Sequence, residues 1–288
     1  MKLIVRADDM GYCEAFNYGY VNAIRNGIVT SAELMIGMPG TEQAVEMLKE
    51  FPWIPVGWHV HVCGKPSADP KLVPRLLDEN GDLCLRISRG HPKDPTLYDE
   101  LYIELKAELD KFIEYMGKKP DIISNVDDQD DPYSRVLREL AIDYHINHLF
   151  RDKTHNCQYY RKWVETENGW TLQEYPFTIM PTHGRWESIQ AQADNYDPKQ
   201  LFLEKYTNLL SQPDGVGLIV FHPGYVDGFI LDYTTCNIAR CRDVQALTSK
   251  EVREHLDKLG VELITSNDYL FGTNEYQEYD KKRKLIKK

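Results

Sequence analysis

The chain has 288 residues, with 34 Lys and Arg against 45 Asp and Glu, which gives a net charge of −11. This excess of acid argues against non-specific nucleic-acid binding and against an anionic membrane surface as partner, because both depend on basic side chains. The first apolar run is too short for a signal peptide, and no segment of 18 apolar residues spans a membrane. The six cysteines form no C-x-x-C pair and no disulfide framework, so we expect a reduced, cytoplasmic protein.

Short apolar runs typical of strands alternate with stretches of helical periodicity along most of the chain. The predicted strands cover residues 2–7, 28–35, 55–62, 120–125, 146–150, 217–221 and 261–264. The predicted helices cover residues 14–26, 40–49, 99–116, 134–144, 201–210 and 252–259. This alternation predicts a parallel sheet, either closed into a barrel or open. We therefore expect one α/β domain over residues 1–272, with loop insertions at about 64–96 and 152–197, and a charged tail at 273–288. The basic end of this tail, Lys281–Lys288, is expected to be frayed and solvated.

Two adjacent carboxylates, Asp8 and Asp9, follow the first predicted strand, and Gly11 permits a sharp turn after them. The carboxyl end of a parallel strand is where α/β folds place their chemistry. Neighbouring residues of a strand point in opposite directions, so one Asp is expected to bind a metal ion and the other to act as a base. The alternative is that one Asp caps the next helix and the other is solvated.

Other polar side chains also stand at predicted strand ends, which gather at one edge of a parallel sheet. They are His59, His61, Asp127, Asp128, Arg151 and His222. Carboxylate oxygen and imidazole nitrogen together suit Zn, Mn, Co or Fe, whereas carboxylates and water alone suit Mg or Ca. The cluster predicts a metal site or an acid–base site. His61 is either an additional ligand or a neighbour that orients His59.

The second insertion is rich in aromatic residues, whose rings pack well on the C–H faces of a sugar. They are Tyr159, Tyr160, Trp163, Trp170, Tyr175, Phe177, Trp186 and Tyr196. We expect them to favour a flat, polyhydroxylated substrate. The alternative is that they form a small core over the mouth of the sheet.

Several short motifs, in order along the chain to about residue 270, make the sequence similar to the YdjC-like carbohydrate deacetylases, a family that includes chitooligosaccharide deacetylases. The motifs are Arg6-Ala-Asp8-Asp9-Met-Gly11, Asn17-Tyr-Gly19, Arg25-Asn-Gly-Ile-Val-Thr-Ser31, Gly57-Trp-His59, Gly64-Lys-Pro66, Gly117-Lys-Lys-Pro120 and Phe221-His222-Pro223-Gly224-Tyr225. The resemblance implies a barrel-like α/β fold related to the NodB-type polysaccharide deacetylases. It also implies a hydrolase that uses one divalent metal ion (Mg, Zn or Mn) to remove acetyl groups from N-acetylated sugars or oligosaccharides, and a homodimer.

The resemblance also implies roles for individual residues. Asp9 and His59 resemble the metal ligands, Asp8 the catalytic base and His222 the residue that assists the leaving group. By the same resemblance, two further residues bind substrate, namely Arg151 and Tyr225.

One position departs from the family pattern. Where the family has a third metal-binding His, counting from Pro120 without gaps leads to Val126. Valine cannot bind a metal, so Asp127 or Asp128 supplies an oxygen ligand instead, or the site is incomplete. We take Asp127 as the ligand and expect that Val126→His would strengthen the binding of zinc-like ions.

This departure keeps two alternative functions open. One is a catalytically weakened relative that binds a sugar or sugar phosphate. The other is a different metal-dependent reaction of a sugar phosphate.

Overall fold

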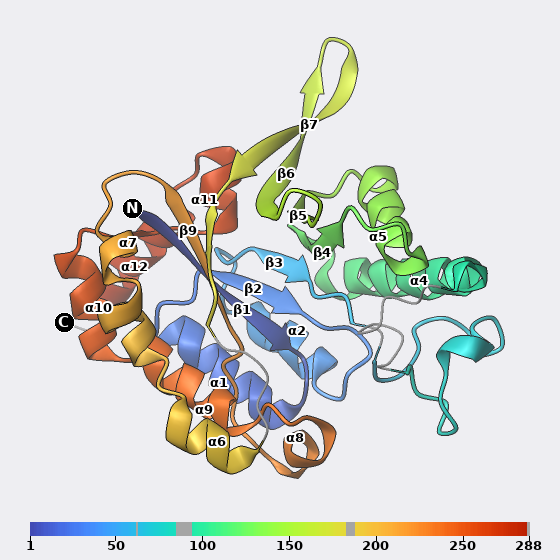
Figure 1. Ribbon diagram of the computed structural model, residues 1–288, viewed down its shortest axis with the longest axis horizontal. Coiled ribbons are helices and arrows are strands. Elements are labelled where there is room, and N and C mark those ends of the chain that lie inside the picture. Colours follow the sequence, from blue (N-terminus) through green and yellow to red (C-terminus); the bar gives the residue numbers. More distant parts are fainter. Residues whose placement is uncertain (62, 85–93, 183–187, 287–288) are drawn as a thin grey trace.

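The computed structural model describes residues 1–61, 63–84, 94–182 and 188–286 (Figure 1). Its centre is a mostly parallel sheet in the order β7-β6-β5-β4-β3-β2-β1-β9-β8, with β10 also paired to β1. The parallel strands are β1 (Lys2–Met10), β2 (Ser31–Leu34), β3 (Val56–Trp58), β4 (Ile123–Asp127), β5 (His148–Asp152), β8 (Thr178–Met180), β9 (Val216–Phe221) and β10 (Glu262–Leu263). The predicted single-domain α/β fold with a parallel sheet is thus confirmed. The pairing path is open, because the described strands include no pairing between β7 and β8.

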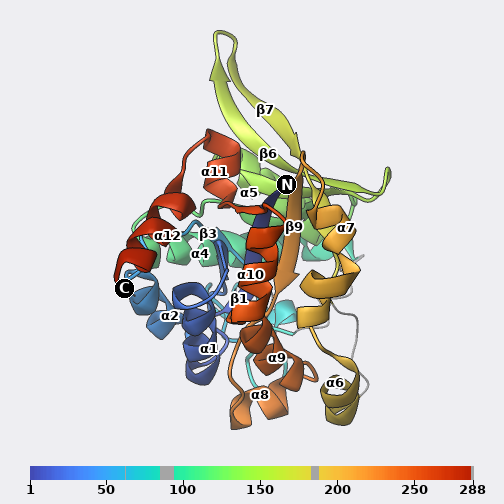
Figure 2. The same ribbon diagram turned by 90° about the vertical axis from the view of Figure 1, so that its left-hand side faces the viewer.

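Most of the helices pack against one face of this sheet, and a single short helix near the C-terminus packs against the other (Figures 1 and 2). The helices of more than six residues are α1 (Glu14–Arg25), α2 (Thr41–Leu48), α4 (Tyr98–Met116), α5 (Pro132–Asp143), α6 (Ile189–Asn195), α9 (Ile238–Leu247), α10 (Lys250–Lys258) and α12 (Glu275–Ile286). The shorter ones are α7 (Thr207–Leu210), α8 (Gly228–Tyr233) and α11 (Ser266–Phe271), and a π-helical turn precedes α7 at Leu201–Lys205. Short 3₁₀ turns lie at Pro74–Leu76 and Pro95–Leu97.

The alternation of side chains along β1 divides the core into two parts. Leu3 and Val5 point into a large cluster shared with α1, α2, α4 and α5. Ile4 points to the other face of the sheet, into a smaller cluster with Tyr160 of β6 and Leu270 of α11. Both faces of β1 are therefore buried, which explains why its sequence is almost continuously apolar up to the acid pair.

The second insertion forms a β-hairpin that projects from the body, built from β6 (Cys157–Thr166) and β7 (Gly169–Pro176) (Figures 1 and 2). Because β6 is antiparallel to β5, it leads away from the carboxyl ends of the parallel strands. Arg161 of β6 pairs with His148, the residue at the start of β5. Trp163 and Trp170 lie beyond this pair in the hairpin, past the end of the sheet that is opposite to the acid pair. The prediction that the aromatic residues of this insertion collect at the mouth of the sheet is therefore wrong for these two rings. Trp186 lies outside the described residues.

The C-terminal segment forms a helix that packs on the body through its first half. The expectation of a frayed end is wrong up to Ile286, although Lys281, Lys282 and Lys284 are exposed as expected. Tyr276 of α12 is 1% exposed, and Tyr279 stacks on Trp53 at a ring distance of 4.2 Å. Asp280 accepts a 2.7 Å hydrogen bond from Arg253 of α10. These apolar and paired charged contacts outweigh the charge of the segment. None of the described helices is both long and apolar enough to cross a membrane.

Candidate metal centre and active site

The acid pair lies at the carboxyl end of β1, as predicted, but strand alternation does not separate its two carboxylates. Asp9 has a φ of 69°, and the pairing with β2 shifts between Ala7 and Met10. This irregularity brings both acids to His59. Its Nε2 lies 3.0 Å from Asp9 Oδ1, and its Nδ1 lies 4.0 Å from Asp8 Oδ2. The expectation that the two acids point in opposite directions is corrected: they share His59 but differ in their other partners.

Asp8 is held by Arg6, two residues earlier on the same strand. The Arg6 Nη2 donates a 2.9 Å hydrogen bond to Asp8 Oδ2, and its Nε lies 2.7 Å from Oδ1. Burial alone would raise the pKa of the Asp8 carboxyl, but the Arg6 guanidinium and the nearby His59 and His222 lower it below its ordinary value. Asp8 is therefore an ionised carboxylate at neutral pH, and its contacts with Arg6 fix its orientation.

Glu33 of β2 is a buried carboxyl group next to Arg6, and no sequence pattern indicated it. Its Oε1 lies 4.0 Å from the Arg6 Nη1, and burial raises its pKa to about 7. The chain makes room for this side chain at Gly57, where a Cβ would lie 2.5 Å from the same oxygen. The glycine of the Gly-Trp-His motif thus permits a carboxyl group to be buried under Arg6.

Asp9 has a guanidinium partner of its own, Arg240 of α9. The Arg240 Nη1 donates a 2.8 Å hydrogen bond to Asp9 Oδ2, while Oδ1 faces His59. Burial opposes ionisation of Asp9, but Arg240 and His59 together hold its pKa well below the ordinary value. Arg240 was missed from the sequence, because 231 residues separate it from Asp9 and its helix carries no recognisable motif.

The donor atoms of Asp9, His59 and His61 lie within 4.8 Å of one another, and the described residues contain no other His, Cys, Asp and Glu group of this kind. Ser124 Oγ lies 3.4 Å from the Nδ1 of His59, which leaves Nε2 directed at Asp9. The two imidazole rings lie 5.4 Å apart. One carboxylate and two imidazoles suit a divalent transition-metal ion, so these residues fit the ion that the family resemblance implies.

His222 follows β9 directly and reaches the same edge of the sheet. Its charge is close enough to lower the pKa of both Asp8 and Asp9. Its backbone N–H donates a 2.9 Å hydrogen bond to the buried Asp243 of α9, and the Tyr196 hydroxyl donates to the other oxygen of that carboxylate at 2.6 Å. The structure thus brings together four of the predicted residues: Asp8, Asp9, His59 and His222.

A backbone irregularity at Asn125, which has a φ of 67°, decides how the end of β4 is oriented. Val126 pairs with Phe150, and both side chains belong to the large core. Asp127 pairs with Arg151, on the opposite face of these two strands. Val126 is fully buried among apolar side chains, so this structure does not support the expectation that a histidine there would reach the metal ligands.

Asp127 lies at the end of β4 and outside the group formed by Asp9, His59 and His61. Its Oδ2 lies 2.6 Å from the Lys153 Nζ, and its Oδ1 accepts a 3.0 Å hydrogen bond from the backbone of Gln129. Asp128 accepts hydrogen bonds from the backbone of Lys153 and Thr154. Both acids therefore hold the turn that follows β5.

Arg151 lies beside these acids. Burial and the charge of Arg6 lower the pKa of Arg151, although the charges of Asp8 and Asp127 oppose this shift. The guanidinium therefore interacts with charged groups at the ends of both β1 and β4.

Tyr225 is 40% exposed, and its hydroxyl accepts a 2.9 Å hydrogen bond from Asn22 in the second half of α1, so its described hydrogen bond leads away from the acid pair. The backbone reaches this position because two glycines permit close packing. A Cβ at Gly19 would lie 2.6 Å from the Tyr225 nitrogen, and one at Gly224 would lie 1.9 Å from the Phe16 ring. The glycines of both motifs thus press the loop after β9 onto α1.

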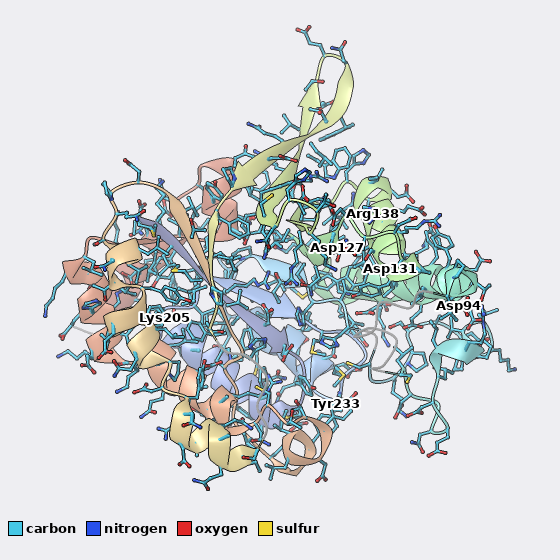
Figure 3. The ribbon with its side chains drawn as sticks, viewed as in Figure 1. Asp94, Asp127, Asp131, Arg138, Lys205 and Tyr233 are labelled. Atoms are coloured by element: carbon cyan, nitrogen blue, oxygen red, sulfur yellow. The ribbon has the colours of Figure 1, made fainter. Side chains whose placement is uncertain are left out.

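Aromatic side chains from two other segments form a cluster that begins directly after the acid pair. Tyr12 follows the pair, and its ring lies 5.6 Å from that of Tyr233, edge to face. Phe229 of α8 stacks on Tyr233 at 4.9 Å. Figure 3 shows Tyr233 and Asp127 on opposite sides of the row of strand ends. The site thus has an aromatic side near α8 and a charged side near the end of β4.

Known proteins resemble this chain over almost its whole length. The model of the family described as YdjC-like protein matches residues 2–258. A carbohydrate deacetylase 2 of Listeria innocua is 30% identical over 93% of this chain and 98% of its own length. A chitooligosaccharide deacetylase of Yersinia enterocolitica is 27% identical over 92% and 98%. A crystal structure of an Enterococcus faecalis protein shares the fold with a TM-score of 0.66 and 22% identity, over 92% and 97% of the two chains. The chain therefore belongs to the YdjC-like protein family.

Proposed function

We propose that the protein is a metal-dependent deacetylase that removes acetyl groups from N-acetylated amino sugars or their oligosaccharides. The observation that carries this proposal is the group formed by Asp9, His59 and His61, next to an ionised carboxylate, Asp8, that Arg6 holds in place. The names of the Listeria and Yersinia relatives support the same reaction.

A divalent ion held by Asp9, His59 and His61 would polarise the acetyl carbonyl and acidify the attacking water. Asp8 accepts the proton of that water, because it is ionised at neutral pH and lies next to the ligand group. His222 donates a proton to the amine nitrogen as the carbon–nitrogen bond breaks. Arg151 and Tyr225 remain the predicted sugar-binding residues, and the rings of Tyr233 and Phe229 provide apolar surface on which a sugar can pack.

His61 replaces Asp127 as the third ligand in this proposal. The donor atoms of His61 lie in the same group as those of Asp9 and His59, whereas Asp127 faces Lys153. A set of one oxygen and two nitrogens favours Zn or Mn over Mg. His61→Ala should therefore weaken the binding of Mn²⁺ by about tenfold or more, while Asp127→Ala should leave it nearly unchanged.

The proposal is tested by acetate release from N-acetylglucosamine and its short β-linked oligomers, with and without a 6-phosphate group, in the presence of Zn²⁺, Mn²⁺ or Mg²⁺. Acetate release that Asp8→Asn abolishes would support it. A rise in Tm with these sugars but no acetate from any of them would instead indicate a sugar-binding relative without catalysis. A homodimer and a phosphorylated substrate stay predictions.

A further inference from the structure

Helix α9 carries a buried arginine, Arg240, that contacts the proposed metal ligand Asp9. Arg240 is 4% exposed, and its Nη1 donates a 2.8 Å hydrogen bond to Asp9 Oδ2. Its Nε donates a 2.6 Å hydrogen bond to the carbonyl of Cys236. Its guanidinium carbon lies 5.0 Å from the ring centre of Tyr12 and 5.1 Å from that of Phe16. These contacts hold the guanidinium through Nη1, through Nε and against two aromatic rings.

The helix that presents Arg240 is itself attached to the active-site loop. One turn after Arg240, the carboxylate of Asp243 accepts the backbone N–H of His222 at 2.9 Å. The carbonyl of Arg240 accepts the backbone N–H of Gly224 at 3.3 Å. Helix α9 therefore cannot slide along the loop without breaking buried hydrogen bonds, and Arg240 keeps its place relative to Asp9.

This arrangement divides the two oxygens of Asp9 between two tasks. Oδ2 is occupied by Arg240, and only Oδ1 faces His59 and the group of donor atoms. A carboxylate that accepts a hydrogen bond from a guanidinium on one oxygen can bind a metal ion through the other oxygen only. The guanidinium also partly neutralises its negative charge. The positive charge of Arg240 also repels a cation across a buried, weakly screened environment. Both effects lower the affinity of the site for a divalent ion, and both leave more positive charge on a bound ion to polarise a carbonyl.

We propose that Arg240 is a positioning residue that restricts Asp9 to a single ligand oxygen and keeps the affinity of this site for divalent cations low. The proposal rests on the metal-dependent function proposed above, but its test does not depend on turnover.

The test is the Kd of Mn²⁺, measured by calorimetry on the full chain and four variants. Arg240→Gln removes the charge but keeps a donor for Asp9, and should bind Mn²⁺ about tenfold more tightly than the parent protein. Arg240→Met is a second neutral variant with an unbranched side chain, in case the first does not fold. Arg240→Lys keeps the charge and should stay within about threefold of the parent. Arg242→Gln is the matched control, since this arginine on the same helix bonds only Gln245 among the described side chains, and it should not change the Kd.

Tighter binding separates this role from a purely structural one, because damage to a site weakens binding. If the neutral variants bind Mn²⁺ no more tightly than the parent, or if Arg240→Lys gains as much as Arg240→Gln, the proposal is wrong. The test of the proposed function by acetate release is separate from this test of Arg240. A parent protein that releases no acetate from any N-acetylated sugar overturns the proposed function, while a tenfold gain in Arg240→Gln would still establish the role of Arg240.

Discussion

Replacing Val126 by His tests the orientation of β4, on which the choice of metal ligands depends. Val126 is fully buried in the large core, opposite Phe150. Losing the burial of a valine costs about 1.5–3 kcal/mol, and an imidazole left without a hydrogen-bond partner costs about 1–3 kcal/mol more. We therefore expect Val126→His to lower the free energy of unfolding by about 3 kcal/mol or more, a large part of the stability of an ordinary domain. We expect no gain in metal affinity.

The assay is urea denaturation at pH 7.5, combined with the Kd of Zn²⁺ for the same variant. Val136→His is the matched control, because Val136 of α5 is equally buried in the same core and lies on a helix behind the sheet. The two variants should lose similar stability and bind Zn²⁺ like the parent protein. A Val126→His variant that kept its stability to within about 1 kcal/mol and bound Zn²⁺ more tightly would show that position 126 faces the site.

Three further predictions concern other parts of the chain. Asp8→Asn should lower turnover by about two to four orders of magnitude with metal binding intact, whereas Asp9→Asn should lose the metal, which acetate assays and calorimetry would distinguish. Burial lowers the pKa of His148 to about 4 and keeps it neutral in the folded protein. The unfolded chain takes up the proton below pH 6.5, so His148 should cost about 2 kcal/mol of stability between pH 7 and pH 5, and His148→Asn should flatten this dependence in urea titrations. Gly224→Ala would place a Cβ 1.9 Å from the Phe16 ring, so it should destabilise the fold by about 2 kcal/mol or more and lower turnover through His222; unchanged stability would contradict the close packing.

The sequence predicted the features that depend on local patterns. The alternation of strands and helices indicated the parallel sheet, and the apolar run before Asp8 indicated its first strand. The start of α5 also follows a local pattern, since the side chain of Asp131, just before Pro132, accepts the backbone N–H of Ser134 at 3.0 Å. Strand ends of a parallel sheet gather at one edge, and this rule alone placed His59 and His222 beside the acid pair.

The features that the sequence did not predict depend on conformation or on long-range contact. Asp9 and Asn125 adopt positive φ values that non-glycine residues rarely have, so the period of two on which strand patterns depend fails at both strand ends. This failure explains why both acids reach His59 and why Val126 points into the core. Arg240 and Glu33 enter the site from a distant helix and from the middle of a strand, where a charged residue carries no local signal of its partner.

The most direct test of the proposed metal-dependent deacetylase is acetate release from di-N-acetylchitobiose by protein from which a chelator has removed divalent ions, before and after stepwise addition of Mn²⁺. The parent protein should be inactive when stripped and should recover with Mn²⁺, while His59→Ala should stay inactive at every Mn²⁺ concentration that restores the parent. Acetate release that persists in the stripped protein, or that His59→Ala recovers as fully as the parent, would contradict the assignment of Asp9, His59 and His61 as the metal centre.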